Sequence, residues 1–180
     1  MDNPHIRAQL KELHLAAYGW TMHCCRHNRA ATEDVLQIVY LKVLEGKAQF
    51  DGESAFKTWL FAVIRKTAAE ERRRNIVWGF RFRFLGEAED PESDESVEDT
   101  IYASEDRAVF SRALARLPRR QQEVLHLVFY QDLTIEEASA ALGISVGSVR
   151  THYERGKKRL RVELEKMEDF NEIRSIRSNP

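Results

Sequence analysis

The stretch that decides the fold is TIEEASAALGISVGSVRTHYERGKKRL, residues 134–160. Thr134 and Glu137 have the spacing of a capping box, which predicts the start of a short helix. Gly143 then interrupts the helical pattern, and Ser145 is placed to cap a second helix. A short helix, a glycine-containing turn and a second helix together predict a helix-turn-helix.

The second helix of this stretch has two different sides. Val146, Val149, Tyr153 and Leu160 fall within roughly one sixth of the circumference at about 100° per residue, which predicts that they face a core. Arg, Ser, Thr and His can hydrogen-bond base edges in a major groove, and Lys and Arg can neutralise phosphates. A solvated surface helix is the alternative, but the capped helix and the turn before it favour DNA binding. The polar and basic residues of the other side and the flanks are Ser148, Arg150, Thr151, His152, Arg155, Lys157, Lys158 and Arg159.

The composition is that of a globular, charge-rich protein. The chain has 180 residues, of which 43% are hydrophobic and 32% charged, so it is long enough for one ordinary domain or two small ones. No apolar run approaches the roughly 20 residues that a membrane-spanning helix needs. The N-terminus, MDNPHIRAQLKELH, lacks the basic and apolar segments of a secretion signal. We therefore expect a cytoplasmic protein.

The net charge of −1 hides a strong asymmetry along the chain. Residues 65–83 include seven basic and two acidic residues, whereas residues 87–106 include ten acidic residues and no basic one. The acidic stretch has few apolar residues, so it cannot bury enough surface to offset the entropy of ordering. The pattern predicts two lobes joined by a flexible acidic linker.

The first lobe also has a helical pattern. Pro4 suits the first turn of one helix, and Thr32 suits the N-cap of a second, which Gly46 would close. A third helix, residues 53–74, places Phe56, Trp59, Leu60, Val63 and Ile64 on one face. The exception to this helical pattern is WGFRFRF, residues 78–84, whose aromatic residues would share one side if the segment were an extended strand. This segment suits either stacking on single-stranded DNA or packing between the lobes, and the cost of exposing clustered Phe favours packing.

Taken together, these segments resemble a known family. Residues 32–74 are similar to conserved region 2 of extracytoplasmic-function (ECF) sigma factors of bacterial RNA polymerase, and residues 113–161 are similar to their region 4. The resemblance implies an all-α fold of two small helical domains. The segments expected from it are a region 2 domain at 1–84, an acidic linker at 85–106, a region 4 helix-turn-helix domain at 107–168 and a C-terminal tail at 169–180.

The resemblance also implies a role for each segment. Asp34, Leu36 and Gln37 match the helix that binds the clamp of core polymerase, although Ile38 stands where the family usually has an acid. The family recognises and melts the −10 promoter element with the next loop and helix, and reads the −35 element with the helix-turn-helix. The residues matched to the −10 element are Phe50, Gly52, Ser54, Lys57, Lys66, Arg72, Arg73 and Arg74.

The function implied is that of a sigma factor, which is not an enzyme and needs no cofactor. Its partners would be core RNA polymerase, promoter DNA and an anti-sigma factor. The alternative is a stand-alone helix-turn-helix regulator, which would have no use for a strand-opening lobe. The sequence contains no phosphate-binding glycine loop and no nucleophile motif. In HCCRH, residues 23–27, the His and Cys residues suit either a metal site or an ordinary helix with small buried thiols, and the second reading is favoured.

Overall fold

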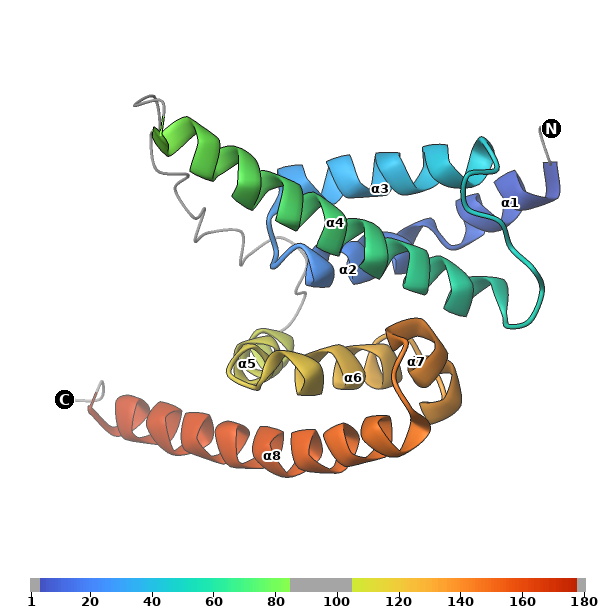
Figure 1. Cartoon of the computed structure of the whole chain (residues 1–180). Helices are drawn as coiled ribbons and strands as arrows, with labels where there is room; N and C mark the ends of the chain where they lie inside the picture. Colours follow the sequence, from blue (N-terminus) through green and yellow to red (C-terminus); the bar gives the residue numbers. More distant parts are fainter. Residues whose placement is uncertain (1–3, 85–104, 178–180) are drawn as a thin grey trace. The chain divides into compact units, whose positions relative to one another are not determined.

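The computed structural model describes residues 4–84 and 105–177. Every regular element in these two ranges is a helix, which confirms the predicted all-α fold (Figure 1). Close contacts divide the chain into two compact units, one made by residues 1–97 with 136–143 and the other by residues 98–135 with 144–180. The predicted linker, 85–106, lies outside the described residues except for its last two positions, which begin a helix.

The first unit is built around three helices that lie side by side. Helices α2, α3 and α4 contact one another, and α1 contacts α2 and α3. Trp20 of α2 is fully buried and its Nε1 donates a hydrogen bond to the carbonyl oxygen of Phe61 in α4 at 3.0 Å. The bounds of the helices are α1 Pro4–Glu12, α2 His14–Cys24, α3 Arg29–Leu44 and α4 Phe56–Phe84.

Helix α3 begins earlier than the sequence predicts. Its N-cap is Asn28, whose side chain accepts a hydrogen bond from the amide of Ala31 at 2.8 Å. Thr32, the expected cap, lies inside the helix and donates its hydroxyl proton to the carbonyl oxygen of Asn28 at 2.7 Å. The expectation for Thr32 was therefore wrong, whereas the chain does turn at Gly46 after the helix ends, with φ at +72°.

Helix α4 is longer than predicted and includes the segment that was expected to resemble a strand. It continues without a break through Phe84, so residues 78–84 are helical. Along the part before Arg74, the predicted apolar stripe is present: Phe56, Leu60 and Ile64 are buried, and Trp59 is half-buried. The extended form of WGFRFRF is therefore corrected to helix.

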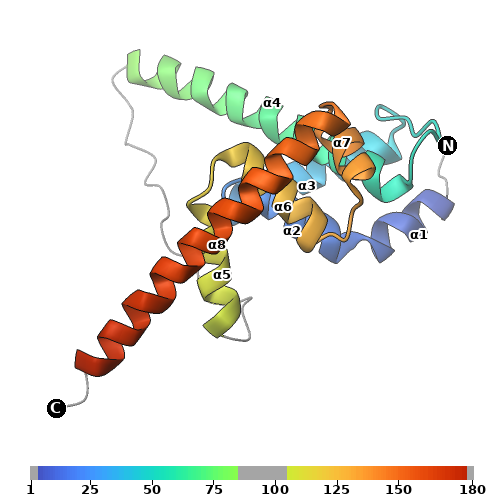
Figure 2. The ribbon, with the colours of Figure 1, turned by 90° about the horizontal axis from the view of Figure 1, so that it is seen from below.

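In the second unit, α5 and α6 both pack against the long helix α8. A core cluster joins Leu114, Leu125 and Leu160, with Tyr153 and Met167 at its edge. Figure 2 shows α8 as one uninterrupted helix, which passes through most of the segment expected to be a tail. The bounds of its helices are α5 Glu105–Ala115, α6 Arg119–Phe129 and α8 Val146–Arg177. Between α6 and α8 the chain forms α7, Ile135–Leu142, whose residues from 136 onward the division above groups with the first unit.

The turn between α7 and α8 has the predicted chemistry. Gly143 takes a φ of +61°, which glycine adopts at little cost, and it is followed by the cap of α8. The Ser145 hydroxyl accepts a hydrogen bond from the amide of Ser148 at 3.2 Å, which confirms Ser145 as the N-cap. The cap fixes the point at which α8 begins, and with it the residues that its first turns present.

Gly156 allows α8 to approach α6 closely. A Cβ placed on Gly156 would lie 3.1 Å from Cδ1 of Leu125 and 3.4 Å from Cβ of Gln121. Gly156→Val is therefore expected to destabilise the second unit by about 1–3 kcal/mol, as overpacking of a well-packed contact usually does. Chemical denaturation followed by circular dichroism measures the change. Gly147→Val is the matched control, because nothing lies within 4 Å of its Cβ position, and equal losses for the two variants would contradict the prediction.

Candidate functional sites

One face of α3 is exposed and carries two of the three residues matched to polymerase binding. Asp34 and Gln37 are exposed, and Leu41, one turn beyond Gln37, is 56% exposed. Positions 34, 37 and 41 share one side of a helix because they are three, four and seven residues apart. The sequence reading missed Leu41, an apolar side chain that lies between polar neighbours on this α3 face.

Leu36 has a different place. It is only 5% exposed and belongs to the buried stripe of α3 with Val35, Val39 and Val43. Its side chain is part of the core of the first unit, so it lies on the opposite side of α3 from the exposed face. Ile38, the departure from the family pattern, is half-buried at the edge of the same face.

The loop before α4 brings three aromatic rings together. The ring of Phe50 lies 5.3 Å from that of Phe56 and 5.4 Å from that of Trp59, and the rings of Phe56 and Trp59 are 5.2 Å apart. Gly52 has a φ of +81°, so the loop reverses at a position that favours glycine. This aromatic cluster joins the loop at Phe50 to the first turn of α4.

Two polar residues expected in the same site lie next to the aromatic cluster in sequence. Ser54 is half-buried in the loop. Lys57 is half-buried on α4, with its Nζ 5.7 Å from the ring centre of Phe61. A lysine above a ring face is held by cation–π attraction, so the Lys57 charge is kept close to the start of the helix.

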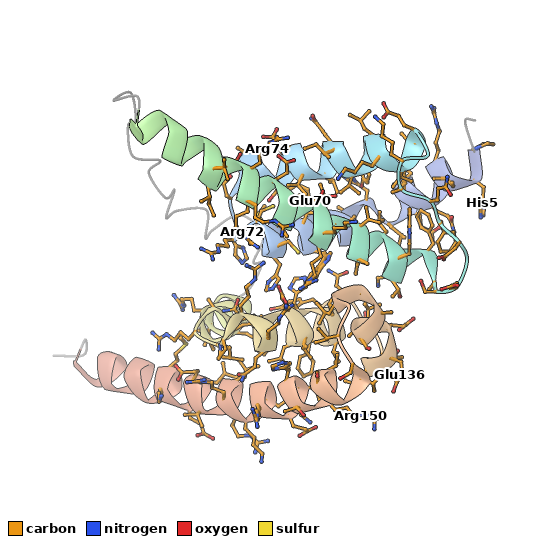
Figure 3. The ribbon with its side chains drawn as sticks, viewed as in Figure 1. His5, Glu70, Arg72, Arg74, Glu136 and Arg150 are labelled. Atoms are coloured by element: carbon orange, nitrogen blue, oxygen red, sulfur yellow. The ribbon has the colours of Figure 1, made fainter. Side chains whose placement is uncertain are left out.

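The basic part of α4 begins at Lys66, more than two turns after Lys57. Lys66, Arg73 and Arg74 are exposed, and Arg74 forms an ion pair with Glu71. Arg72 is half-buried and points to the opposite side of the helix from Arg74 (Figure 3). The positive charge of Arg72 acts on the thiol of Cys25, and Arg72 is the one half-buried residue of the four predicted to bind phosphates.

The HCCRH segment forms the end of α2 and the turn after it. Cys24 is buried, and the Sγ of Cys25 donates to the carbonyl oxygen of Ala31 at 3.6 Å. Burial raises the pKa of the Cys25 thiol, and a hydrogen bond with Thr32 and the charge of Arg72 lower it by less. A thiol that stays protonated is a poor metal ligand. Among the side chains that the structure describes, no three possible ligands come together.

The first half of α8 presents most of the residues predicted to contact duplex DNA. Ser148, Arg150, Thr151 and Arg155 are exposed, as are Lys158 and Arg159. Arg150 projects from α8 on the side away from α6 (Figure 3). The hydroxyl of Thr151 donates to the carbonyl oxygen of Gly147 at 2.9 Å, which leaves its oxygen able to accept.

His152 and Lys157 lie on the flank of α8 and are half-buried. The Nζ of Lys157 lies 4.4 Å from the ring centre of Tyr153 and 3.0 Å from Oε1 of Glu154. These contacts hold the lysine against the helix surface. Glu154 is thereby paired, so its charge opposes DNA less than that of a lone carboxylate would.

Beyond these sites, no described helix has the length and apolar composition that a bilayer span requires. At the start of α6, the buried carboxylate of Glu123 forms ion pairs with Arg119 at 3.1 Å and with Arg120 at 2.8 Å. A buried carboxylate with two guanidinium partners fixes the first turn of α6.

Comparison with known proteins identifies the family of the chain. Two family models match the chain, Sigma-70 region 2 over residues 10–76 and Sigma-70, region 4 over residues 107–160. The ECF RNA polymerase sigma factor SigX of Bacillus subtilis is 33% identical over 74% of this chain and 71% of its own. The ECF RNA polymerase sigma factor RpoE of Cereibacter sphaeroides is 26% identical over 72% and 70%.

Solved structures share the fold. The sigma factor RpoE in complex with the anti-sigma factor NepR from Bartonella quintana has a TM-score of 0.72 at 21% identity, covering 91% of this chain and 98% of that one. CnrH, in complex with the cytosolic domain of CnrY, has a TM-score of 0.60 at 20% identity, covering 91% and 90%. Both sigma-70 regions match in order, and SigX is 33% identical to the chain. The chain therefore belongs to the ECF-type sigma-70 family, whose members are non-catalytic subunits that bind core RNA polymerase and promoter DNA and direct promoter-specific transcription initiation.

Proposed function

We propose that this sigma factor divides its work among three surfaces. The exposed α3 face, with Asp34, Gln37 and Leu41, binds core polymerase. The loop before α4 and the basic side of α4 bind the −10 element as a melted strand, and the first half of α8 reads the −35 element as duplex. The regions that carry these surfaces are residues 1–84 and 107–168.

The observation that carries the −10 assignment is the joining of an aromatic cluster and exposed cations on one helix. Phe50 of the preceding loop and Trp59 of the first turn of α4 are half-buried beside the buried Phe56, and Lys66 and Arg73 are exposed further along the helix. Single-stranded DNA is bound by this combination, because bases stack on rings while cations hold phosphates. Duplex DNA offers no free base faces, so the cluster favours a melted strand.

The −35 assignment rests on the exposed side of α8. Arginine forms paired hydrogen bonds with guanine in a major groove, and hydroxyl groups contact either kind of base. Arg150, Thr151 and Arg155 lie in the N-terminal turns of the second helix of a helix-turn-helix, where base contacts are made in this motif. Lys158 and Arg159, further along, would contact phosphates.

A protein partner that blocks these surfaces is part of the proposal. The two solved structures described above are complexes, one of them with an anti-sigma factor. An anti-sigma factor that covers the α3 face would prevent polymerase binding. The proposed location is the cytoplasm, where transcription takes place.

The proposed function is tested by footprinting with core polymerase. A promoter is first identified upstream of the transcripts that overexpression of the protein induces. Adding the protein to core polymerase should make thymines around −10 reactive to permanganate, and should protect the −35 element. Protection of duplex DNA without core polymerase, and without reactive thymines, would instead indicate a stand-alone regulator.

The α3 face gives a direct prediction for polymerase binding. Leu41→Glu should weaken binding to core polymerase by about 30-fold, because an exposed apolar side chain at the centre of an interface is worth about 2 kcal/mol. Leu15→Glu is the matched control, since Leu15 of α2 is 84% exposed and lies outside the α3 face. Competition with labelled wild-type protein for core polymerase measures both. Similar affinities for the two variants would remove Leu41 from the interface.

A further inference from the structure

Lys42 joins the polymerase-directed helix α3 to the basic helix α4. Its Nζ donates to Oε2 of Glu70 at 3.0 Å and to the hydroxyl oxygen of Thr67 at 3.2 Å. Thr67 is buried, and the side chains of Lys42 and Glu70 are 33% and 38% exposed. Because two acceptors on α4 hold one ammonium group, the position of the Glu70 carboxylate is fixed on the side of α4 that faces α3.

Glu70 has other cations within reach on its own helix. Lys66 lies four residues before it, and Arg73 and Arg74 lie three and four residues after it. Opposite charges at these spacings form ion pairs on helices. Glu71 already pairs with Arg74, and within the described residues neither Lys66 nor Arg73 has an ion-pair partner. The acid best placed to neutralise them is held by Lys42 instead.

We propose that Lys42 is a positioning residue for DNA binding, which keeps Glu70 away from Lys66 and Arg73 so that both cations remain available to phosphates. This inference rests on the proposed binding of a melted strand by α4. Without Lys42, the Glu70 carboxylate would turn to the cations of its own helix. Each phosphate that approached would then have to displace an internal ion pair.

The test uses the full chain and three variants: Lys42→Met, Glu70→Gln and the double variant. Binding of a fluorescein-labelled oligothymidylate is measured by fluorescence anisotropy over a series of salt concentrations. Lys42→Met should weaken binding by about 3- to 5-fold and lower the salt slope by about 0.7, the effect of losing one phosphate contact on a single strand. The double variant should recover the wild-type affinity and slope, because no acid is left to occupy the cations.

Arg29→Met is the matched control. Arg29 pairs with Glu33 at 3.0 Å on the surface of α3, so this variant removes the same charge and breaks an ion pair without touching α4. It should bind the oligonucleotide as the wild type does. Circular dichroism checks that every variant is folded.

The decisive result is the double variant. If Lys42→Met and the double variant bind equally weakly, Lys42 acts by contacting DNA itself or by holding the helices together, and the proposal is wrong. A failure of the proposed function looks different: Lys66→Gln with Arg73→Gln would then leave the affinity and the salt slope of the wild type unchanged.

Discussion

Replacing Arg150 and Arg155 together by alanine is expected to weaken binding to a −35 duplex by about a hundredfold, since each arginine paired with a base is worth about 1–3 kcal/mol. Both side chains are exposed on the first half of α8. The loss should be largest for the cognate sequence. Competition between cognate and scrambled duplexes measures it.

Arg161→Ala is the matched control for this prediction. Arg161 is exposed on the same helix but lies beyond the residues proposed to enter the groove. It should reduce affinity slightly and by the same factor for both duplexes, through phosphate contact alone. A double variant that loses affinity equally for cognate and scrambled DNA would show that Arg150 and Arg155 read no bases.

Replacing Trp20 by alanine is expected to cost the first unit about 3–5 kcal/mol of its free energy of unfolding, the range for removing a large buried aromatic side chain. Trp20 is fully buried, its ring lies 6.0 Å from that of Phe61, and its indole proton is donated to α4. The loss approaches the whole stability of a small domain. Polymerase binding should then disappear because the α3 face is no longer held together.

Urea unfolding followed by far-UV circular dichroism measures this change. Trp59→Ala is a useful comparison, because Trp59 is half-buried in the aromatic cluster before and within α4. It should cost less stability than Trp20→Ala and should instead weaken binding to a melted strand. If both variants unfold at the same urea concentration, Trp20 is not the centre of the core that its burial indicates.

The features that the sequence predicted well are those set by local chemistry. The cap of α8 at Ser145 and the turn at Gly143 depend on one side chain or one backbone angle, so neither needs knowledge of distant residues. Thr32 misled because a threonine hydroxyl also bonds the carbonyl four residues earlier inside a helix. The actual cap, Asn28, is also a preferred N-cap residue, but the two acids after Thr32 resembled the first turn of a helix that begins at Thr32.

Periodicity bears on two further predictions, the place of Leu36 in α3 and the form of residues 78–84. Leu36 shares its spacing with Val39 and Val43, so the apolar stripe of α3 already indicated that Leu36 is buried and that Leu41 is not. The alternation in residues 78–84 suggested a strand, but a strand needs a partner for its backbone groups, and a helix already under way satisfies them internally. The Lys42 bridge joins residues 28 positions apart, a contact that no local pattern reveals.

The unbroken length of α8 limits how much of this helix the proposed −35 contact can use. At 32 residues the helix is about 48 Å long, whereas a major groove is only about 12 Å wide. Its later turns carry Glu163, which pairs with Arg116 and Lys166, and the exposed Glu165. For the proposed −35 contact, the groove therefore accommodates only the first turns of α8, and the turns around Leu160 and Met167, which pack against α5, lie outside it.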